Sequence, residues 1–181
     1  AHRTQALQQA GRVSWDQTAK RARETFETIL AVEPDRQSKL RQGIKPRLAF
    51  VAPLPPERTG IADYSAELLP ALAEYYDICL IVVQDRFEQQ WAQVGYEVHD
   101  VQWLLDNAHS LDRVLYQMGN SPFHDHMLAL MQEVPGTVVL HDFYLSGLIG
   151  WREQHGGYPH DWVKALYASH GYNAVAELYK D

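Results

Sequence analysis

The sequence contains little of what marks a secreted, membrane-spanning or nucleic-acid-binding protein. Cys79 is the single cysteine among 181 residues, so no internal disulfide can form. No apolar run is long enough to span a bilayer, and the opening residues AHRTQALQQA do not resemble a signal peptide. With 16 basic and 23 acidic residues the net charge is −7, and no dense Lys/Arg stripe is present. We therefore expect no nucleic-acid partner.

Several catalytic signatures are also missing. There is no GxGxxG fingerprint and no Walker loop, so neither a standard dinucleotide site nor a P-loop is indicated. No nucleophile elbow, Ser-His-Asp order or paired-carboxylate motif is present. Cys79 lies in the apolar run DICLIVV and is interpreted as a buried structural thiol.

Two regions of different character follow one another along the chain. Residues 14–32 have helical apolar spacing behind a capping box, and a polar stretch with Pro34 and Gly43 follows. From residue 47 onward, apolar strands alternate with helical patterns; the strands are expected at 47–53, 77–83, 112–120 and 136–142. Because these strands are apolar throughout, they predict an α/β fold with a parallel sheet covered by helices on both faces. Pro70 lies inside the first of these helices, where we expect a kink rather than a break.

Ligands of such sheets bind beyond the carboxyl ends of the strands, so the residues that follow each strand are the informative ones. The turn PLPPERTGIADY (53–64) leads from the first strand into a helix N-terminus, where backbone amides and the helix dipole favour an anion. Gly60 would let a phosphate or sugar approach the main chain. The alternative is a plain tight turn whose glycine only relieves strain.

Histidines follow two of the other strands. His141 and Asp142 could hydrogen-bond a sugar hydroxyl, and His141 could shuttle a proton; the alternative is a helix-capping or otherwise satisfied histidine. His124 and His126 flank Asp125, but neighbours at i and i+2 of a helix face apart, so we expect solvated side chains and no metal site. Asn120 could contact a ligand or simply end its strand.

Three of these segments, PLPPERTGIADYSAELLPAL, RVLYQMGNSPFHDHMLALM and GTVVLHDFYLSGLIG, together resemble the N-terminal half of bacterial retaining glycosyltransferases of the GT-B type (glycosyltransferase family 4-like). The resemblance covers residues 46–155 and implies a Rossmann-like, acceptor-side domain that transfers sugar from a nucleotide-diphosphate donor without a metal or other cofactor. It implies a catalytic role for His141. The donor-phosphate and acceptor-binding residues that it implies are Gly60, Ile61, Asp63, Tyr64, Asn120, Ser121, Asp142 and Phe143.

The resemblance also implies a domain organisation. Residues 1–32, through GRVSWDQTAKRARETFETIL, are similar to the C-terminal tail helix of the same family, which predicts a tandem parent protein; the alternative is a generic amphipathic helix. Residues 33–45 would be a linker, and residues 46–181 the acceptor-side domain. The family's second, donor-binding domain is not in this chain, so we expect the chain alone to be inactive.

The remaining expectations concern partners and location. The resemblance implies a glycan or lipid-linked acceptor in surface polysaccharide synthesis, and a cytoplasmic parent protein that can associate with the inner face of the membrane. Two alternatives stay open. One is a non-catalytic α/β binding or scaffold module, and the other is a nucleotide-sugar epimerase or similar Rossmann enzyme, which the missing GxGxxG disfavours.

Overall fold

The computed structural model describes residues 43–83, 91 and 94–180. The predicted helix at 14–32 and most of the predicted linker lie outside them. The chain divides into two compact units at Ile44/Lys45, and all the elements described here belong to the second unit.

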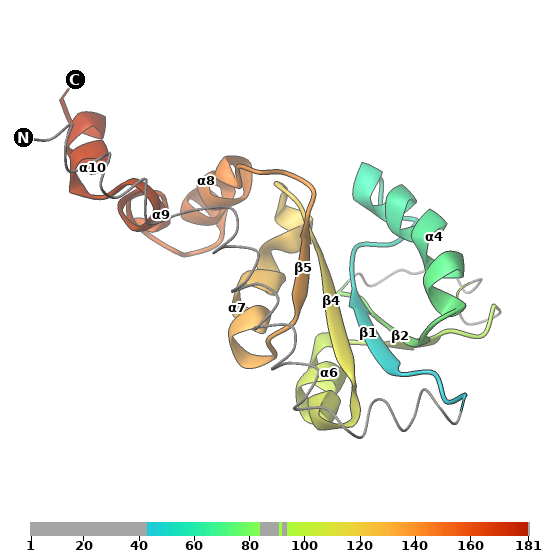
Figure 1. Ribbon diagram of the computed structural model, residues 1–181. Coiled ribbons are helices and arrows are strands. Elements are labelled where there is room, and N and C mark those ends of the chain that lie inside the picture. The colour runs from blue at the N-terminus through green and yellow to red at the C-terminus, as the bar shows by residue number, and fades with distance from the viewer. Residues whose placement is uncertain (1–42, 84–90, 92–93, 181) are drawn as a thin grey trace, which may run out of the picture. The chain divides into compact units, whose positions relative to one another are not determined.

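A five-stranded parallel sheet forms the centre of this unit (Figure 1), with the strand order β3-β2-β1-β4-β5. The strands are β1 (Arg47–Val51), β2 (Asp77–Ile81), β3 (Glu97–His99), β4 (Arg113–Met118) and β5 (Thr137–Leu140). The chain adds β2 and β3 on one side of β1 and then crosses to add β4 and β5 on the other side. The strand order therefore reverses between β1 and β4, which is the topological switch point of an open α/β sheet.

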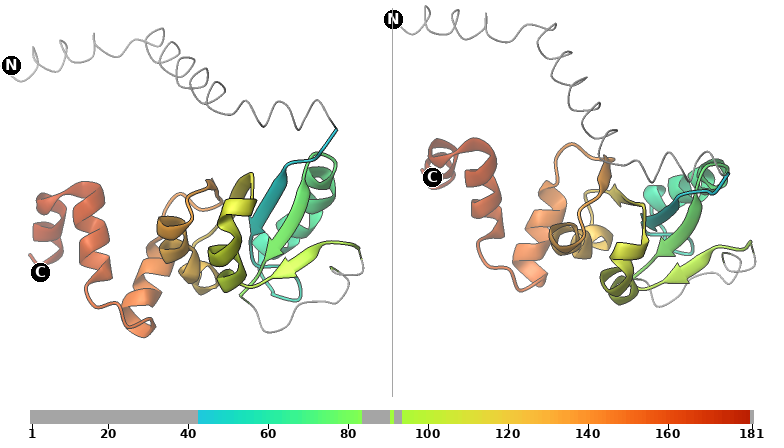
Figure 2. Two further views of the ribbon diagram at one scale, coloured as in Figure 1. Left: turned by 90° about the horizontal axis from the view of Figure 1, so that it is seen from below. Right: turned by 60° about the horizontal axis from the view of Figure 1, so that its bottom comes forward.

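Six α-helices and two short 3-10 helices accompany the sheet in the described residues. The helices are α4 (Gly60–Ala73), α6 (Val101–Asn107), η1 (Ala108–Ser110), η2 (Pro122–His124), α7 (Asp125–Glu133), α8 (Ser146–His155), α9 (Asp161–His170) and α10 (Tyr172–Leu178). Helix α4 covers one face of the sheet, while α6 and α7 cover the other (Figure 2). This is the predicted α/β architecture, a Rossmann-like parallel sheet between helices.

Two apolar cores, one on each face, explain why the strands are apolar throughout. Successive strand residues point to opposite faces. In β1, Leu48 and Phe50 join the core under α4, whereas Ala49 and Val51 join the core under α6, α7 and α8. Both faces of β1 are therefore buried from solvent, as predicted from the apolar run RLAFVAP (47–53).

After β4, Pro122–His124 forms a 3-10 turn, η2, before the α-helix α7 begins at Asp125, and the Ser121 side chain makes no capping bond to a backbone amide. Helix α4, by contrast, continues through Pro70 to Ala73 without a break.

The predicted burial of strand 136–142 is also wrong. Val138 and Leu140 of β5 are 41% and 47% exposed, because β5 is the edge strand of the described sheet. None of the helices in the described part of the chain combines the length and apolar character needed to cross a membrane.

Candidate functional site

Three segments that are far apart in the sequence meet at the carboxyl edge of the sheet. The ring of Tyr64, in α4, lies edge-on to the imidazole of His141, after β5, with 4.9 Å between the ring centroids. The backbone amide of Asn120, after β4, donates to Asp142 Oδ2 at 2.8 Å. Residues of all three predicted segments therefore lie close together at this edge.

Gly119 allows the first two segments to come so close. A Cβ atom at this position would lie 2.2 Å from Ile61 Cδ1 and 3.0 Å from His124 Cε1. A side chain at this position would have to displace the end of the Ile61 side chain and the His124 imidazole. The glycine therefore lets these two side chains pack against the end of β4.

The N-terminus of α4 is capped by Thr59. Its Oγ1 atom accepts a hydrogen bond from the Ala62 amide at 3.0 Å, as expected of a threonine cap. The preceding amides of Gly60 and Ile61 are among those that a helix leaves without an intrahelical acceptor. They are the groups that could bind an anion here.

Gly60 does not relieve backbone strain, because it is not among the glycines with positive φ. The simple strain alternative for this residue is therefore wrong. In the described part of the chain, no heavy atom lies within 4 Å of the position its Cβ would take. The space beside the main chain is open, which is the condition for close approach of a ligand.

Asn120 has a structural role at the start of α8. Its Oδ1 atom accepts the Leu148 amide at 2.9 Å, so the side chain satisfies one of the first donors of that helix. Ser121 Oγ lies 3.0 Å from His124 Nδ1. The polar groups of Asn120, Ser121 and Asp142 thus already have partners within the protein.

His141 is oriented by a residue that the sequence analysis missed. Its Nε2–H donates to Gln117 Oε1 at 2.7 Å, and Gln117 is fully buried at the end of β4. This bond leaves Nδ1 as the ring nitrogen with a free lone pair. The sequence feature that could have indicated Gln117 is that it is the single amide side chain in the otherwise apolar run VLYQM (114–118).

Two of the other predicted site residues are exposed. Asp63 lies on the outer side of the first turn of α4, and Phe143 is 82% exposed and packs edge-on against Tyr144. The exposed rings of Phe143 and Tyr144 are perpendicular to each other, and each offers an apolar face of the kind that a sugar ring can cover.

The expectation of solvated histidines at 124–126 is wrong for His124, whereas His126 is half-buried. His124 is only 1% exposed, and its pKa is lowered chiefly by burial. Burial also lowers the pKa of His126 to about 4. Both imidazoles are therefore neutral at pH 7. No signal in the sequence separated these two side chains from solvated ones.

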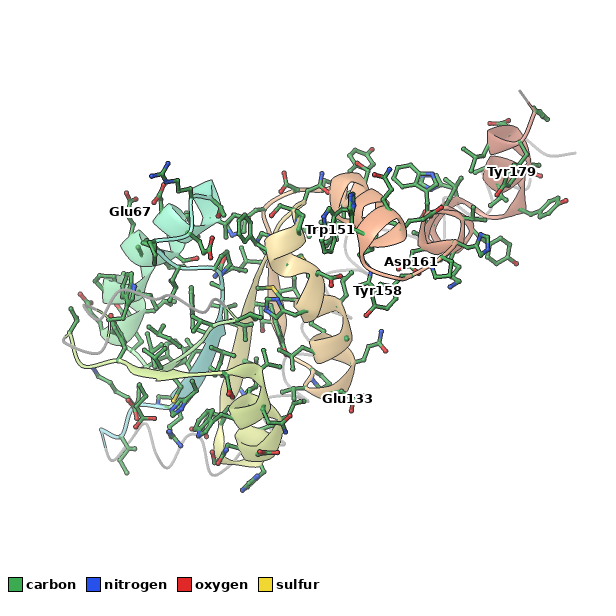
Figure 3. All side chains as sticks on the ribbon, turned by 180° about the vertical axis from the view of Figure 1, so that it is seen from behind. Glu67, Glu133, Trp151, Tyr158, Asp161 and Tyr179 are labelled. Atoms are coloured by element: carbon green, nitrogen blue, oxygen red, sulfur yellow. The ribbon has the colours of Figure 1, made fainter. Side chains whose placement is uncertain are left out.

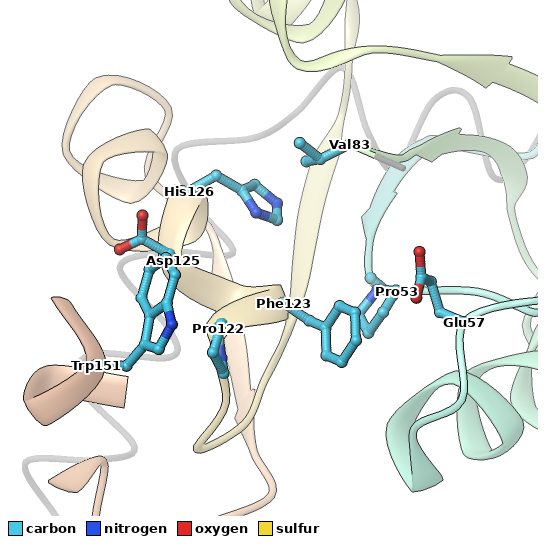
Figure 4. Close-up of a pocket in the computed structure, with 9 residues that line it drawn as sticks. Pro53, Glu57, Val83, Pro122, Phe123, Asp125, His126 and Trp151 are labelled. Carbon is cyan, nitrogen blue, oxygen red and sulfur yellow. The ribbon is translucent and has the colours of Figure 1, made fainter. Parts of the chain in front are cut away.

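A cavity of about 270 Å³ lies at the same edge of the sheet (Figure 4). Phe123 lies beside Pro53 and Glu57 on one side of it, while the His126 imidazole extends from α7 toward Val83. The rest of its lining is Ala52, Pro122, Asp125 and Trp151. The cavity therefore spans the carboxyl ends of β1, β2 and β4, at the topological switch point.

The lining of this cavity contains none of the nine predicted site residues. The carboxyl edge thus carries two neighbouring features. One is the cluster of Gly60, Tyr64, Asn120 and His141, and the other is the mostly apolar cavity with one neutral imidazole and two carboxylates.

Comparisons with known proteins give no match: no protein-family model fits the chain, and neither the curated proteins nor the solved structures contain a significantly similar chain.

Proposed function

We propose that this chain is the acceptor-side half of a retaining GT-B glycosyltransferase. Such an enzyme transfers a sugar from a nucleotide diphosphate to a glycan or lipid-linked acceptor. The observation that carries the proposal is the convergence of Gly60, Tyr64, Asn120 and His141 on the carboxyl edge of one parallel sheet. In this class of fold, that edge is where ligands bind.

The chemistry of the edge supports a sugar-phosphate ligand. The amides at the start of α4 and the helix dipole favour a phosphate, and the open space beside Gly60 admits one. His141, held through Nε2 by Gln117, presents Nδ1 as a hydrogen-bond acceptor for a hydroxyl group.

The neighbouring cavity, which the predicted site residues do not line, is smaller than a complete ligand pocket. Its volume of about 270 Å³ falls just below the ~300–1,000 Å³ of complete ligand pockets. A second domain closing over this edge would supply the missing wall and most of the groups that bind the nucleotide. The donor-binding domain would also supply most of the basic groups that stabilise the leaving phosphate.

The test is transfer by the parent protein that carries both domains, with His141→Ala compared against His109→Ala. His109 is an exposed histidine on η1, which precedes β4 in the chain and contains none of the predicted site residues. If His141 takes part in proton transfer, its loss should lower turnover by roughly 10²–10⁴-fold, while circular dichroism stays unchanged. Equal turnover of both variants would remove His141 from the mechanism.

A Gly60→Val variant tests the phosphate cradle separately. The Cβ atom of the new side chain meets no described atom within 4 Å, so the fold should persist, but the side chain would occupy the space proposed for the phosphate. Donor affinity should fall while acceptor affinity is kept. An unaltered donor affinity would contradict the cradle.

A non-catalytic binding module is the second candidate, and the hydrogen bonds of Asn120 and Asp142 favour it. Both side chains are used inside the protein, which leaves fewer groups for chemistry. A parent protein that binds glycan without turning over any nucleotide sugar would support this candidate.

A further inference from the structure

A second cluster of reactive side chains lies on β2 and β3, apart from the candidate site. Cys79, Glu97 and His99 each offer one ligand atom, and these three atoms lie within 4.8 Å of one another. Cys79 Sγ is 3.5 Å from Glu97 Oε2, and His99 Nε2 is 3.3 Å from the same oxygen.

The parallel register explains why they meet. Glu97 pairs with Cys79 across the two strands, and His99 follows two residues later on β3. Residues at i and i+2 of a strand point to the same face. The spacing Glu-x-His therefore converges on a strand, whereas the same spacing in the helical His124–His126 segment does not.

Two of the three separations fit a tetrahedral metal ion. Bond lengths of about 2.0–2.3 Å from zinc to N, O and S ligands place neighbouring ligand atoms roughly 3.3–3.8 Å apart. The two distances measured to Glu97 Oε2 fall within or at the edge of this range. A thiol, an imidazole and a carboxylate are also the donor set that zinc prefers.

The surrounding residues hold the Cys79 and His99 side chains in place, whereas the Glu97 side of the cluster is open to solvent. Cys79 is 1% exposed. The His99 ring stacks on Trp103 of α6, with centroids 3.7 Å apart and planes inclined by 4°. The Glu97 side chain is 58% exposed, so a cation and a water ligand can enter from its side.

A cation already occupies part of this space. Arg47 Nη2 lies 3.3 Å from Cys79 Sγ and 3.1 Å from Glu97 Oε2. A metal ion would have to displace this guanidinium, which has other partners at hand in Asp77 at 3.9 Å and Ser110 at 3.5 Å. Arg47 is thus a competitor of the metal.

We propose that Cys79, Glu97 and His99 bind a divalent cation of the zinc class, with water as the fourth ligand and in competition with Arg47. Binding releases the thiol proton of Cys79 to solvent and forms the metal–thiolate bond. Glu97 and His99 contribute a carboxylate oxygen and Nε2.

Cobalt(II) added to the metal-free full chain tests the proposal, because thiolate-to-cobalt charge transfer absorbs in the near ultraviolet. Cys79 is the only cysteine, so this absorption can arise from no other residue of the chain. We expect the band in the native protein, and we expect zinc to abolish it by displacing cobalt.

Substitutions distinguish a metal site formed by all three side chains from cobalt binding to the Cys79 thiol alone. Glu97→Gln and His99→Gln should each weaken cobalt binding by at least about tenfold. Arg47→Met should strengthen binding by removing the competing charge. His170→Gln, which alters an exposed histidine on α9, should change nothing. Circular dichroism checks that each variant is folded.

Two results would overturn the proposal. One is the absence of the charge-transfer band in both the native protein and Arg47→Met. The other is a band whose cobalt dependence is the same in Glu97→Gln, His99→Gln and the native chain, because the thiol would then bind without its two partners.

Discussion

The central strands and the last two helices are stabilised by different interactions. In β1 four of five residues are buried, and they contribute to two apolar cores. In α9 and α10 no residue is buried. An ion pair between Arg152 and Asp161 connects α9 to α8 instead.

Arg152 is the centre of that connection, and two of its partners, Tyr158 and Asp161, are labelled in Figure 3. It is 9% exposed, forms ion pairs with Asp125 of α7 and Asp161 of α9, and lies 3.8 Å from the ring centroid of Tyr158. These two carboxylates help raise its pKa, against the lowering effect of burial. Apolar burial thus stabilises the sheet, whereas a charge network stabilises the α8–α9 junction, and substitutions should separate the two.

The largest expected effect is that of Phe50→Ala in β1. Phe50 is fully buried, so the cavity left behind should lower the free energy of unfolding by about 3–5 kcal/mol. Phe143→Ala is the matched control, because Phe143 is 82% exposed; its cost should stay within about 0.5 kcal/mol. Urea denaturation measures both. Similar losses for the two variants would contradict the burial assigned to β1.

The second effect is that of Arg152→Met. The substitution leaves Asp125 and Asp161 without their shared partner, at side-chain exposures of 27% and 18%. We expect a loss of about 2–3 kcal/mol, less than for a fully buried pair. Amide hydrogen exchange should accelerate first in α8 and α9, while β1 and β2 stay protected.

Lys164→Met is the control for that variant. Lys164 also pairs with Asp161, but at 3.7 Å and with a side chain that is 69% exposed. Its loss should cost less than about 1 kcal/mol. If exchange accelerated uniformly across the sheet and helices in Arg152→Met, the junction would not be a separately stabilised region.

The smallest effect is the pH dependence caused by His126. Its imidazole titrates at about 4 in the folded protein against an ordinary value of 6.5, because burial disfavours the charged form and His124 adds to this, while Asp125 opposes it. As the pH falls, the unfolded chain takes up this proton first. The stability that the neutral His126 imidazole contributes is therefore fully present above pH 6.5 and is lost between pH 6.5 and about 4.

We expect the loss to reach about 1–3 kcal/mol, since the ring borders the cavity and is not fully shielded. Denaturation midpoints of His126→Gln should fall less steeply over this range than those of the native chain. His109→Gln, which alters an exposed histidine, should follow the native curve. Parallel curves for His126→Gln and the native chain would contradict the shifted pKa.

These comparisons also show what could be predicted from the sequence. The runs RLAFVAP and DICLIVV predicted β1 and β2 and their two-sided burial, because a strand between two helical layers must be apolar on both faces. The run GTVVLHD predicted a strand correctly but not its exposure. Apolar character alone does not say whether a strand is central or at an edge, since that depends on the strand order.

The candidate site was predictable in its location but not in its bonding. Strand ends place Gly60, Asn120 and His141 on one edge in any parallel sheet, and they do meet there. The bond from Leu148 to Asn120 depends on where α8 begins, which no local pattern indicates. The cavity combines residues from Ala52 to Trp151, so it exists only once the chain is folded. The functional roles proposed for these residues stay predictions.

The exposed strand β5 has a consequence for how the domain can be extended. Its Thr137–Leu140 backbone is the boundary of the described sheet, and the side chains of Val138 and Leu140 remain accessible to water. Amides and carbonyls along such a boundary act as a template for a further strand. A strand added there, from this polypeptide or another, would take its alignment from residues 137–140 and would shield these two side chains from solvent.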